Sequence, residues 1–295
     1  MRTIDDFVSS SPFEIVEPAA QCSPFVFNSP HSGTAYPRSF LNSSRLDSSS
    51  IRRSEDTFVD ELFAGVVELG APLMRAHFPR AFLDVNREPY ELDPAMFSGR
   101  LPAYVNARSI RVAGGLGTIA RVVADSEEIY RDRLPVAEGL DRIERIYKPY
   151  HAALRDRLAE TMANFGVAVL VDCHSMPSTA RGLENRPRPD LIIGDRFGTS
   201  CAPGLADTAI ALLSDLGYHV GRNRPYAGGY ITEHYGRPQS GLHALQIEVN
   251  RGLYMDEQRF RKTAGFDALA QDLALFAERL MALALYSGAV ADAAE

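Results

Sequence analysis

Polar side chains that could bind a metal ion follow or interrupt the most apolar stretches of this chain of 295 residues. His31 stands in the segment SPHSG, shortly after the apolar run at 24–27, and His174 follows the run VAVLV. A catalytic zinc ion takes three protein ligands and keeps one position for water, and two imidazoles plus one carboxylate are a common ligand set. His31 and His174 are therefore candidate metal ligands.

The third ligand has two candidates, Glu55 and Asp56 in the segment SEDTFVDELF. Both also fit a structural role, because acids in the first turn of a helix are favoured by the helix dipole. A histidine in a turn is, in the same way, more often a hydrogen-bonding residue than a ligand. Asp172, in VDCHS, fits either a role in the site or a cap at the end of its strand.

Glu248 lies inside the apolar segment LQIEVN. A buried carboxylate must be paired or carry a function. Glu248 could act as a general base beside water on the metal, whose pKa the metal lowers toward about 7. The structural alternative is an ion pair with Arg251 or with another arginine nearby.

Two segments, FLDVNR and IEVNR, share the order carboxylate, Val, Asn, Arg and place Arg87 and Arg251 at equivalent positions. Arginine binds carboxylates through two parallel hydrogen bonds, so this pair suits a substrate with one or two carboxylates. The alternative is that Asp84 pairs with Arg80 or Arg87 as part of the scaffold.

Other catalytic motifs are weak or missing. The segment GGLG at 114–117 lacks the GK[ST] ending of a P-loop. The sequence holds no GxSxG, which disfavours a nucleophile-elbow serine hydrolase. Cys173 and His174 are neighbours on a predicted strand and should point to opposite faces, which disfavours a Cys–His nucleophile pair.

The elements that must position these residues alternate between strands and helices. The continuous apolar run at 167–175 is typical of a central strand covered on both faces. Predicted strands cover 24–28, 72–75, 81–85, 167–175, 190–195 and 243–250, and predicted helices cover 55–69 (Ser54 as N-cap, Gly70 as stop), 136–165, 204–216 and 256–285. Residues 88–119 and 180–189 are predicted loops that could close over a ligand.

This alternation predicts an α/β fold of three layers, with a central mixed sheet between helices. In such sheets ligands bind at the carboxyl ends of strands, which is where His31, Asp172 and His174 lie. We expect one metallohydrolase domain over 1–295, with 1–23 as a polar lead-in.

The composition of the chain argues against some classes of binding partner and some cellular compartments. The formal charge of −7 argues against nucleic acid and anionic membranes. Three cysteines without a CxxC pair favour a reducing compartment. The N-terminus lacks an apolar core of signal-peptide length, and no run of about 18 apolar residues suggests a membrane span. We expect a cytoplasmic protein, and the sequence leaves open whether it forms a homo-oligomer.

A series of blocks resembles, in order, the N-formylglutamate amidohydrolase (N-formylglutamate deformylase) family over about 25–257. The blocks are SPHSG, SEDTFVDELF, RAFLDVNREP, GGLGTIAR, PYH, VDCHSMPS, IIGDRFGTSC, NRPYAGGYITEHYG and HALQIEVNRGLYMDE. The resemblance implies a hydrolase that converts N-formyl-L-glutamate to formate and L-glutamate in histidine degradation. It also implies a fold similar to the zinc carboxypeptidases (phosphorylase/hydrolase-like).

The resemblance assigns roles residue by residue. His31, Asp56 and His174 match the metal ligands, with Asp56 fitting the block better than Glu55, and Glu248 matches the base. The chain lacks the HxxE that follows the first ligand in carboxypeptidases, since Thr34 stands there. The expected cofactor is one divalent ion, Zn²⁺, although Co, Mn or Fe suits the same ligands.

Substrate-binding cations are expected among the arginines of the chain, with Arg87 and Arg251 first and Arg121 and Arg181 after them. Two alternatives stay open. One is a related amidohydrolase that acts on another N-acyl amino acid or a short peptide. The other is an inactive binding protein for acidic amino acids, which would bind without turnover and hold no metal.

Overall fold

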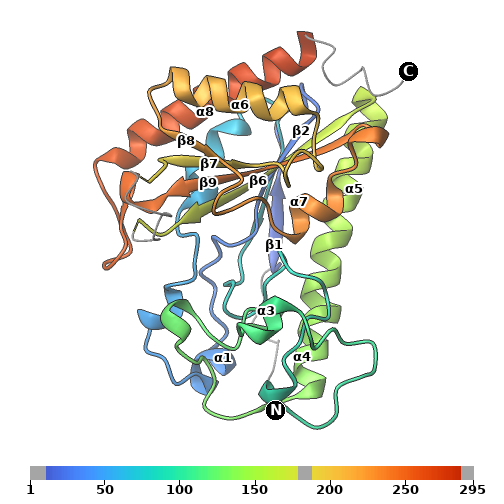
Figure 1. The fold of residues 1–295 in the computed structure, drawn as a ribbon, viewed down its shortest axis with the longest axis vertical. Helices are drawn as coiled ribbons and strands as arrows, with labels where there is room; N and C mark the ends of the chain where they lie inside the picture. Colours follow the sequence, from blue (N-terminus) through green and yellow to red (C-terminus); the bar gives the residue numbers. More distant parts are fainter. Residues whose placement is uncertain (1–10, 179–187, 287–295) are drawn as a thin grey trace. The chain divides into compact units, whose positions relative to one another are not determined.

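The computed structural model describes residues 11–178 and 188–286 (Figure 1). The chain divides into two compact units. The first comprises 1–14, 30–55 and 75–155, and the second comprises 15–29, 56–74 and 156–295. Each unit is thus assembled from separated stretches of the chain, and the expectation of a single domain over 1–295 stays a prediction.

A mixed sheet of seven strands forms the centre of the fold, as predicted. Its order is β1 (Phe13–Val16), β3 (Leu73–Ala76), β2 (Phe25–Ser29), β6 (Ala168–Met176), β9 (Leu242–Asn250), β7 (Leu191–Gly194) and β8 (Val220–Arg222). Strand β6 runs parallel to both β2 and β9, and β7 runs antiparallel to β9 and parallel to β8. Strand β1 lies within the predicted polar lead-in, and β8 had no predicted counterpart.

The two faces of the central strands differ in chemistry. Alternate residues such as Phe27, Val171, Cys173 and Ile247 are fully buried in one hydrophobic core. Helices α6 (Pro203–Asp215), α8 (Gly265–Tyr286) and α2 (Val59–Leu62) contribute to this core, and Figure 1 shows α6 and α8 on the same side of the sheet. Helix α7 (Tyr230–Tyr235) contacts β6 and β9 and lies on the opposite side. This arrangement confirms the predicted α/β/α layers.

The other face of the same strands carries polar side chains toward the carboxyl ends of β6 and β9. Because successive side chains of a strand alternate between faces, Asp172 and His174 share the face opposite Cys173. The parallel register places Asp172 beside Gln246 and His174 beside Glu248. The predicted separation of Cys173 from His174 is therefore confirmed, and the polar residues needed for a site gather on one face.

The predicted helix over 55–69 is wrong in its extent. Helix α2 covers only Val59–Leu62, and a 3₁₀ turn follows at Ala64–Val66. Phe58 has φ of 67°, in the left-handed region, so no helix runs back through it. Tyr254 also donates from its hydroxyl to the Thr57 carbonyl at 3.0 Å. Asp56 consequently precedes the helix instead of lying in its first turn, whereas Gly70, with φ of 86°, ends the segment as expected.

The predicted strand over 81–85 is also wrong. The amides of Phe82 and Leu83 donate to the Pro79 carbonyl at 2.9 and 3.3 Å, which makes a turn. Asp84 donates its amide to the Thr118 carbonyl at 2.8 Å. The apolar run is buried because it packs inside the first unit, so burial here does not reflect pairing in a sheet.

The remaining predicted elements are recovered with shifted bounds. The helical region at 136–165 contains α4 (Val136–Arg142), a π-helical turn (Ile143–Tyr147) and α5 (Lys148–Phe165), while the C-terminal helix α8 starts only at Gly265. Residues 88–119 are mostly irregular, as predicted. The short elements are α1 (Arg38–Ser43), η2 (Ser50–Arg52), η4 (Pro94–Met96), β4 (Phe97–Ser98), α3 (Ile110–Ala113), η5 (Ala124–Ser126), β5 (Leu134–Pro135), η7 (Pro238–Ser240), η8 (Arg251–Leu253), β10 (Met255–Asp256) and β11 (Arg261–Lys262).

Within the described ranges, no helix combines the length and the apolar character that crossing a bilayer requires.

Candidate metal centre

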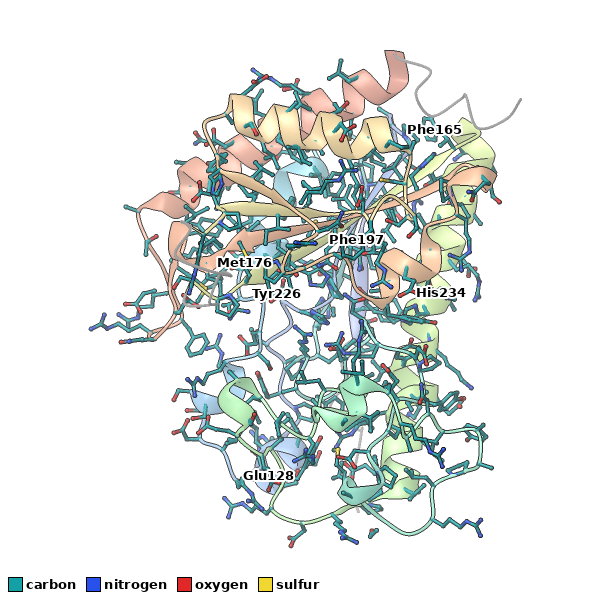
Figure 2. The ribbon with its side chains drawn as sticks, in the orientation of Figure 1. Glu128, Phe165, Met176, Phe197, Tyr226 and His234 are labelled. Atoms are coloured by element: carbon teal, nitrogen blue, oxygen red, sulfur yellow. The ribbon has the colours of Figure 1, made fainter. Side chains whose placement is uncertain are left out.

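The end of β6 carries the first candidate ligand in a fixed orientation. Met176, labelled in Figure 2, is the last residue of this strand. His174 Nε2 lies 2.8 Å from Asp172 Oδ2, and Asp172 Oδ1 accepts a hydrogen bond from Asn28 Nδ2 at 2.8 Å. An ionised carboxylate can only accept, so Nε2 carries the proton and donates. A metal would then be bound by Nδ1 of His174.

Asp56 is the carboxylate that meets this Nδ1. Its Oδ2 lies 2.9 Å from His174 Nδ1. Its other oxygen accepts from Arg251 Nη2 at 3.0 Å and from Ser175 Oγ at 3.3 Å. Arg251 Nε also donates to Ser175 Oγ at 3.0 Å. Arg251 and Ser175 therefore hold Asp56 with Oδ2 directed at the imidazole.

His31 follows β2 and is held in a comparable way. Its Nε2 lies 2.7 Å from Asp84 Oδ1. Asp84 is itself fixed by Arg80 Nε at 3.0 Å, by Arg87 Nη2 at 3.5 Å and by the Asn86 amide at 2.8 Å. The scaffold role considered for Asp84 is thus present, and Asp84 also orients an imidazole.

His31, Asp56 and His174 are all buried, and each offers a ligand atom that lies within 4.8 Å of the other two. A zinc ion bonds imidazole nitrogen and carboxylate oxygen at about 2.0–2.2 Å, and these three residues supply two such nitrogens and one such oxygen. Metal-bound histidines characteristically donate their other ring N–H to a carboxylate. Asp84 and Asp172 occupy that place here, so these residues fit a divalent cation.

The electrostatics of the site favour positive charge. Burial alone would lower the pKa of His174, but the carboxylates of Asp172 and Asp56 outweigh it and hold the pKa well above the usual value. Burial likewise opposes ionisation of Asp84, yet Arg87, Arg80 and His31 keep its pKa well below the usual range. The negative charge that stabilises a protonated His174 would also stabilise a divalent cation there.

Glu248, the predicted base, lies opposite His174 in the register of β6 and β9 and is 7% exposed. Its Oε1 accepts a hydrogen bond from Gln246 Nε2 at 2.8 Å. Parallel neighbours in register share a face of the sheet, so Glu248 and His174 project from the same side. The catalytic role of Glu248 stays a prediction that this position supports.

The other acidic candidate, Glu55, has different partners. Its carboxylate accepts from Arg52 Nε and Nη2 at 3.0 Å and from the Tyr36 hydroxyl at 2.6 Å. A carboxylate bound by a guanidinium and a phenol is a scaffold feature, whereas Asp56 belongs to the ligand cluster. The geometry therefore favours Asp56 over Glu55.

The predicted substrate-binding arginines have contacts of different kinds. Arg251 pairs with Asp56, and Arg121 pairs with Asp93 at 2.9 Å and Glu128 at 3.4 Å. Arg87 donates to the carbonyls of Leu116 and Asn86, both at 2.8 Å, and burial lowers its pKa to about 10. Arg181 lies outside the described residues. Their binding of substrate stays a prediction.

Sequence reasoning missed three residues that hold the site: Asp84 as a partner of His31, Ser175 as a partner of Asp56, and Gln246 as a partner of Glu248. The contact between Gln246 and Glu248 could have been predicted from the sequence. Gln246 and Glu248 are two apart in a segment otherwise apolar, and a period of two puts both on one face of a strand. For Asp84, no pattern along the chain indicates a contact with a residue 53 positions earlier.

Comparison with known proteins finds a matching family and similar solved structures. Residues 23–255 match the N-formylglutamate amidohydrolase family. The chain is 31% identical to the N-formylglutamate deformylase of Pseudomonas aeruginosa over 238 residues, which are 80% of this chain and 83% of that protein. It superposes with a TM-score of 0.87 and 38% identity on the crystal structure of N-formylglutamate amidohydrolase from Ralstonia eutropha JMP134, covering 92% of this chain and 98% of that one. The Atu2144 protein of Agrobacterium tumefaciens shares the fold at a TM-score of 0.67 and 19% identity, over 94% of this chain and 98% of that one.

Proposed function

Because the chain belongs to the N-formylglutamate amidohydrolase family, we propose that it hydrolyses N-formyl-L-glutamate to formate and L-glutamate. The observation that carries this proposal is the buried cluster of His31, Asp56 and His174 with Glu248 beside it on the sheet. We further propose that the reaction serves histidine degradation in the cytoplasm. Cys22, Cys173 and Cys201 are free thiols, which supports a reducing compartment.

The three clustered residues would hold one divalent ion, and zinc suits two imidazoles and a carboxylate. Such an ion supplies Lewis acidity, which lowers the pKa of water and polarises a carbonyl oxygen. The chain itself prepares the ligands. Asp172 and Asp84 keep the Nε2 protons in place, and Arg251 with Ser175 holds Asp56.

Glu248 is the group that moves protons in this proposal. It takes a proton from the attacking water as the carbon–oxygen bond to the formyl carbon forms. It then gives this proton to the amide nitrogen as the carbon–nitrogen bond breaks, so that formate and the free amine leave. Gln246 donates to Oε1 of Glu248, which restricts the orientation of the carboxylate.

Arg87 is the proposed contact for a substrate carboxylate. The Arg87 side chain is 11% exposed, and its Nη2 lies 3.5 Å from Oδ2 of Asp84, the residue that orients His31. An arginine so placed can bind a carboxylate while it stays anchored to the scaffold. An Arg87→Ala variant should raise KM more for a dicarboxylate than for a monocarboxylate substrate, and equal effects on both would limit Arg87 to a scaffold role.

A substrate panel tests the proposed activity. Formate or the corresponding acid should be released from N-formylglutamate much faster than from N-formylaspartate, N-acetylglutamate or a dipeptide. Preference for another acyl group would overturn the deformylase assignment and would leave the metal site standing. Binding of glutamate without turnover of any compound, by protein that contains no metal, would instead favour an inactive binding protein.

A further inference from the structure

Two neighbouring strands carry the same arrangement on the polar face of the sheet. On β6, Asp172 holds His174 two residues later. On β9, Gln246 holds Glu248 two residues later, with Nε2 to Oε1 at 2.8 Å. The register sets Asp172 beside Gln246 and His174 beside Glu248. His174 and Glu248 thus each have a partner two residues earlier on the same strand and on the same face.

The orientation of the Gln246 amide follows from its second contact. The backbone N–H of Gly229 lies 2.7 Å from Gln246 Oε1. A backbone N–H can only donate, so the group that faces it must be the carbonyl oxygen of the side chain. The amide nitrogen must then face Glu248, and it can only donate. Gln246 therefore presents a fixed donor to the carboxylate of Glu248.

The Gly229 amide is itself firmly placed by the segment at 223–229. The Arg196 amide donates to the Ala227 carbonyl at 2.8 Å, and Arg196 Nη1 donates to the Gly228 carbonyl at 3.2 Å. A side chain at Gly194, the last residue of β7, would come within 2.7 Å of the Ala227 backbone. Phe197 and Tyr226, labelled in Figure 2, belong to the two segments that meet here. The donor to Glu248 is thus tied to a packed backbone.

We propose that Gln246 is a positioning residue, which fixes the carboxylate of Glu248 by a hydrogen bond whose direction Gly229 enforces. This inference rests on the proposed role of Glu248 as the base. A carboxylate held at Oε1 by this hydrogen bond loses rotational freedom, which limits the orientations from which it can take a proton. Gln246 is 4% exposed, so water competes little for its amide. Gln246 acts through Glu248 and does not itself touch the substrate.

Two substitutions separate this role from simple packing. Gln246→Glu keeps an oxygen that accepts from Gly229 but removes the donor to Glu248. Gln246→Met removes both hydrogen bonds and keeps a side chain of similar volume. Positioning predicts that both variants lose kcat roughly 10- to 100-fold, the scale of one hydrogen bond to a charged group, with KM within about threefold and metal content unchanged. Gln239→Glu, which adds the same charge at an exposed residue, should keep full kcat.

Kinetic measurements on a double variant complete the test. In a Glu248→Gln protein, adding Gln246→Met should change the residual rate by less than about twofold, because the partner through which Gln246 acts is gone. A full additional loss would show that Gln246 supports the fold only, and wild-type kcat in Gln246→Glu would overturn the inference as well. Near-normal activity of Glu248→Gln alone would instead refute the proposed role of Glu248 as the base. Absence of formate release by the unsubstituted protein would refute the proposed function, so the failures are distinguishable.

Discussion

At the scale of single residues, each functional side chain of the site has a polar partner that restricts it. His31 has Asp84, His174 has Asp172, Asp56 has Arg251 and Ser175, and Glu248 has Gln246. Partners of metal ligands fix the tautomer and the ring orientation, and their loss typically costs 10- to 100-fold in metal affinity or activity. The functions of the ligands and of their partners can therefore be tested separately.

Glu248→Gln should keep the metal and the fold, while kcat falls by at least about 100-fold, the usual scale for loss of a general base. The amide is nearly isosteric with the carboxylate but cannot accept the proton from water. Steady-state kinetics together with metal analysis of the same sample measure this. An activity close to that of the natural chain would remove Glu248 from the mechanism.

Asp84→Asn should weaken metal binding by roughly 10- to 100-fold, because Asp84 orients the His31 ring. A chelator competition gives the affinity. Asp93→Asn is the matched control, since Asp93 also pairs with an arginine of the same unit, Arg121, but not with an imidazole. Equal metal affinities in the two variants would contradict the role assigned to Asp84.

At the scale of elements, the sequence predicts best those strands in which nearly all residues are buried. Strand β6 is buried along its whole length and β9 is buried except at its two end residues, so a largely apolar run identifies each of them. The segment at 55–69 has helical spacing, but the contacts of Asp56 with Arg251 and His174 and of Thr57 with Tyr254 hold its start outside a helix. Those contacts join residues more than a hundred positions apart, so no local pattern reports them.

The sequence likewise indicates those site residues that stand out locally, and it does not indicate contacts between residues far apart in the chain. His31, His174 and Glu248 stand out because a polar side chain in or after an apolar strand needs an explanation. The pairing of His31 with Asp84 could not be foreseen, because the segment at 81–85 is buried without belonging to the sheet. The choice of Asp56 over Glu55 likewise depends on Arg52 and Tyr36, which take Glu55.

The turn after β7 offers a prediction on pH at this scale. Burial would raise the pKa of Asp195, but hydrogen bonds from Arg222, Asn223 and the Gly198 amide outweigh it and lower the pKa. A carboxyl with a lowered folded pKa adds stability above its unfolded pKa, near 3.8, and this stability is lost as the pH falls through the folded value. Asp195→Asn should therefore destabilise most at neutral pH, by about 1–3 kcal/mol, with a gap that narrows below about pH 4.

Denaturant unfolding of both proteins at several pH values measures that gap. Asp207 provides the control, since it binds the same arginine, Arg222, at 2.7 Å but is 63% exposed. Asp207→Asn should cost less than about 1 kcal/mol, because exposed ion pairs contribute little. A constant gap for Asp195→Asn down to pH 3 would show that its ionisation does not stabilise the turn.

At the scale of the whole molecule, binding of the metal should raise the stability of the folded protein as well as its activity. An ion that binds only the folded chain stabilises it by about 2.7 kcal/mol when its concentration is 100 times Kd. The ligands His31, Asp56 and His174 come from three separate stretches of the sequence, so no unfolded chain presents them together. Added zinc should raise the Tm of chelator-treated protein, and it should leave the Tm of a His174→Ala variant unchanged.

The central claim is that two imidazoles and Asp56 share one divalent ion beside Glu248. Its most direct test measures metal content and formate release from N-formylglutamate on one purified sample, as chelator-treated protein is titrated with zinc. Formate release should rise in proportion to bound metal and level off at about one ion per chain, and His174→Ala should show neither binding nor activity. Full formate release by metal-free protein, or metal bound equally well without His174, would contradict the claim.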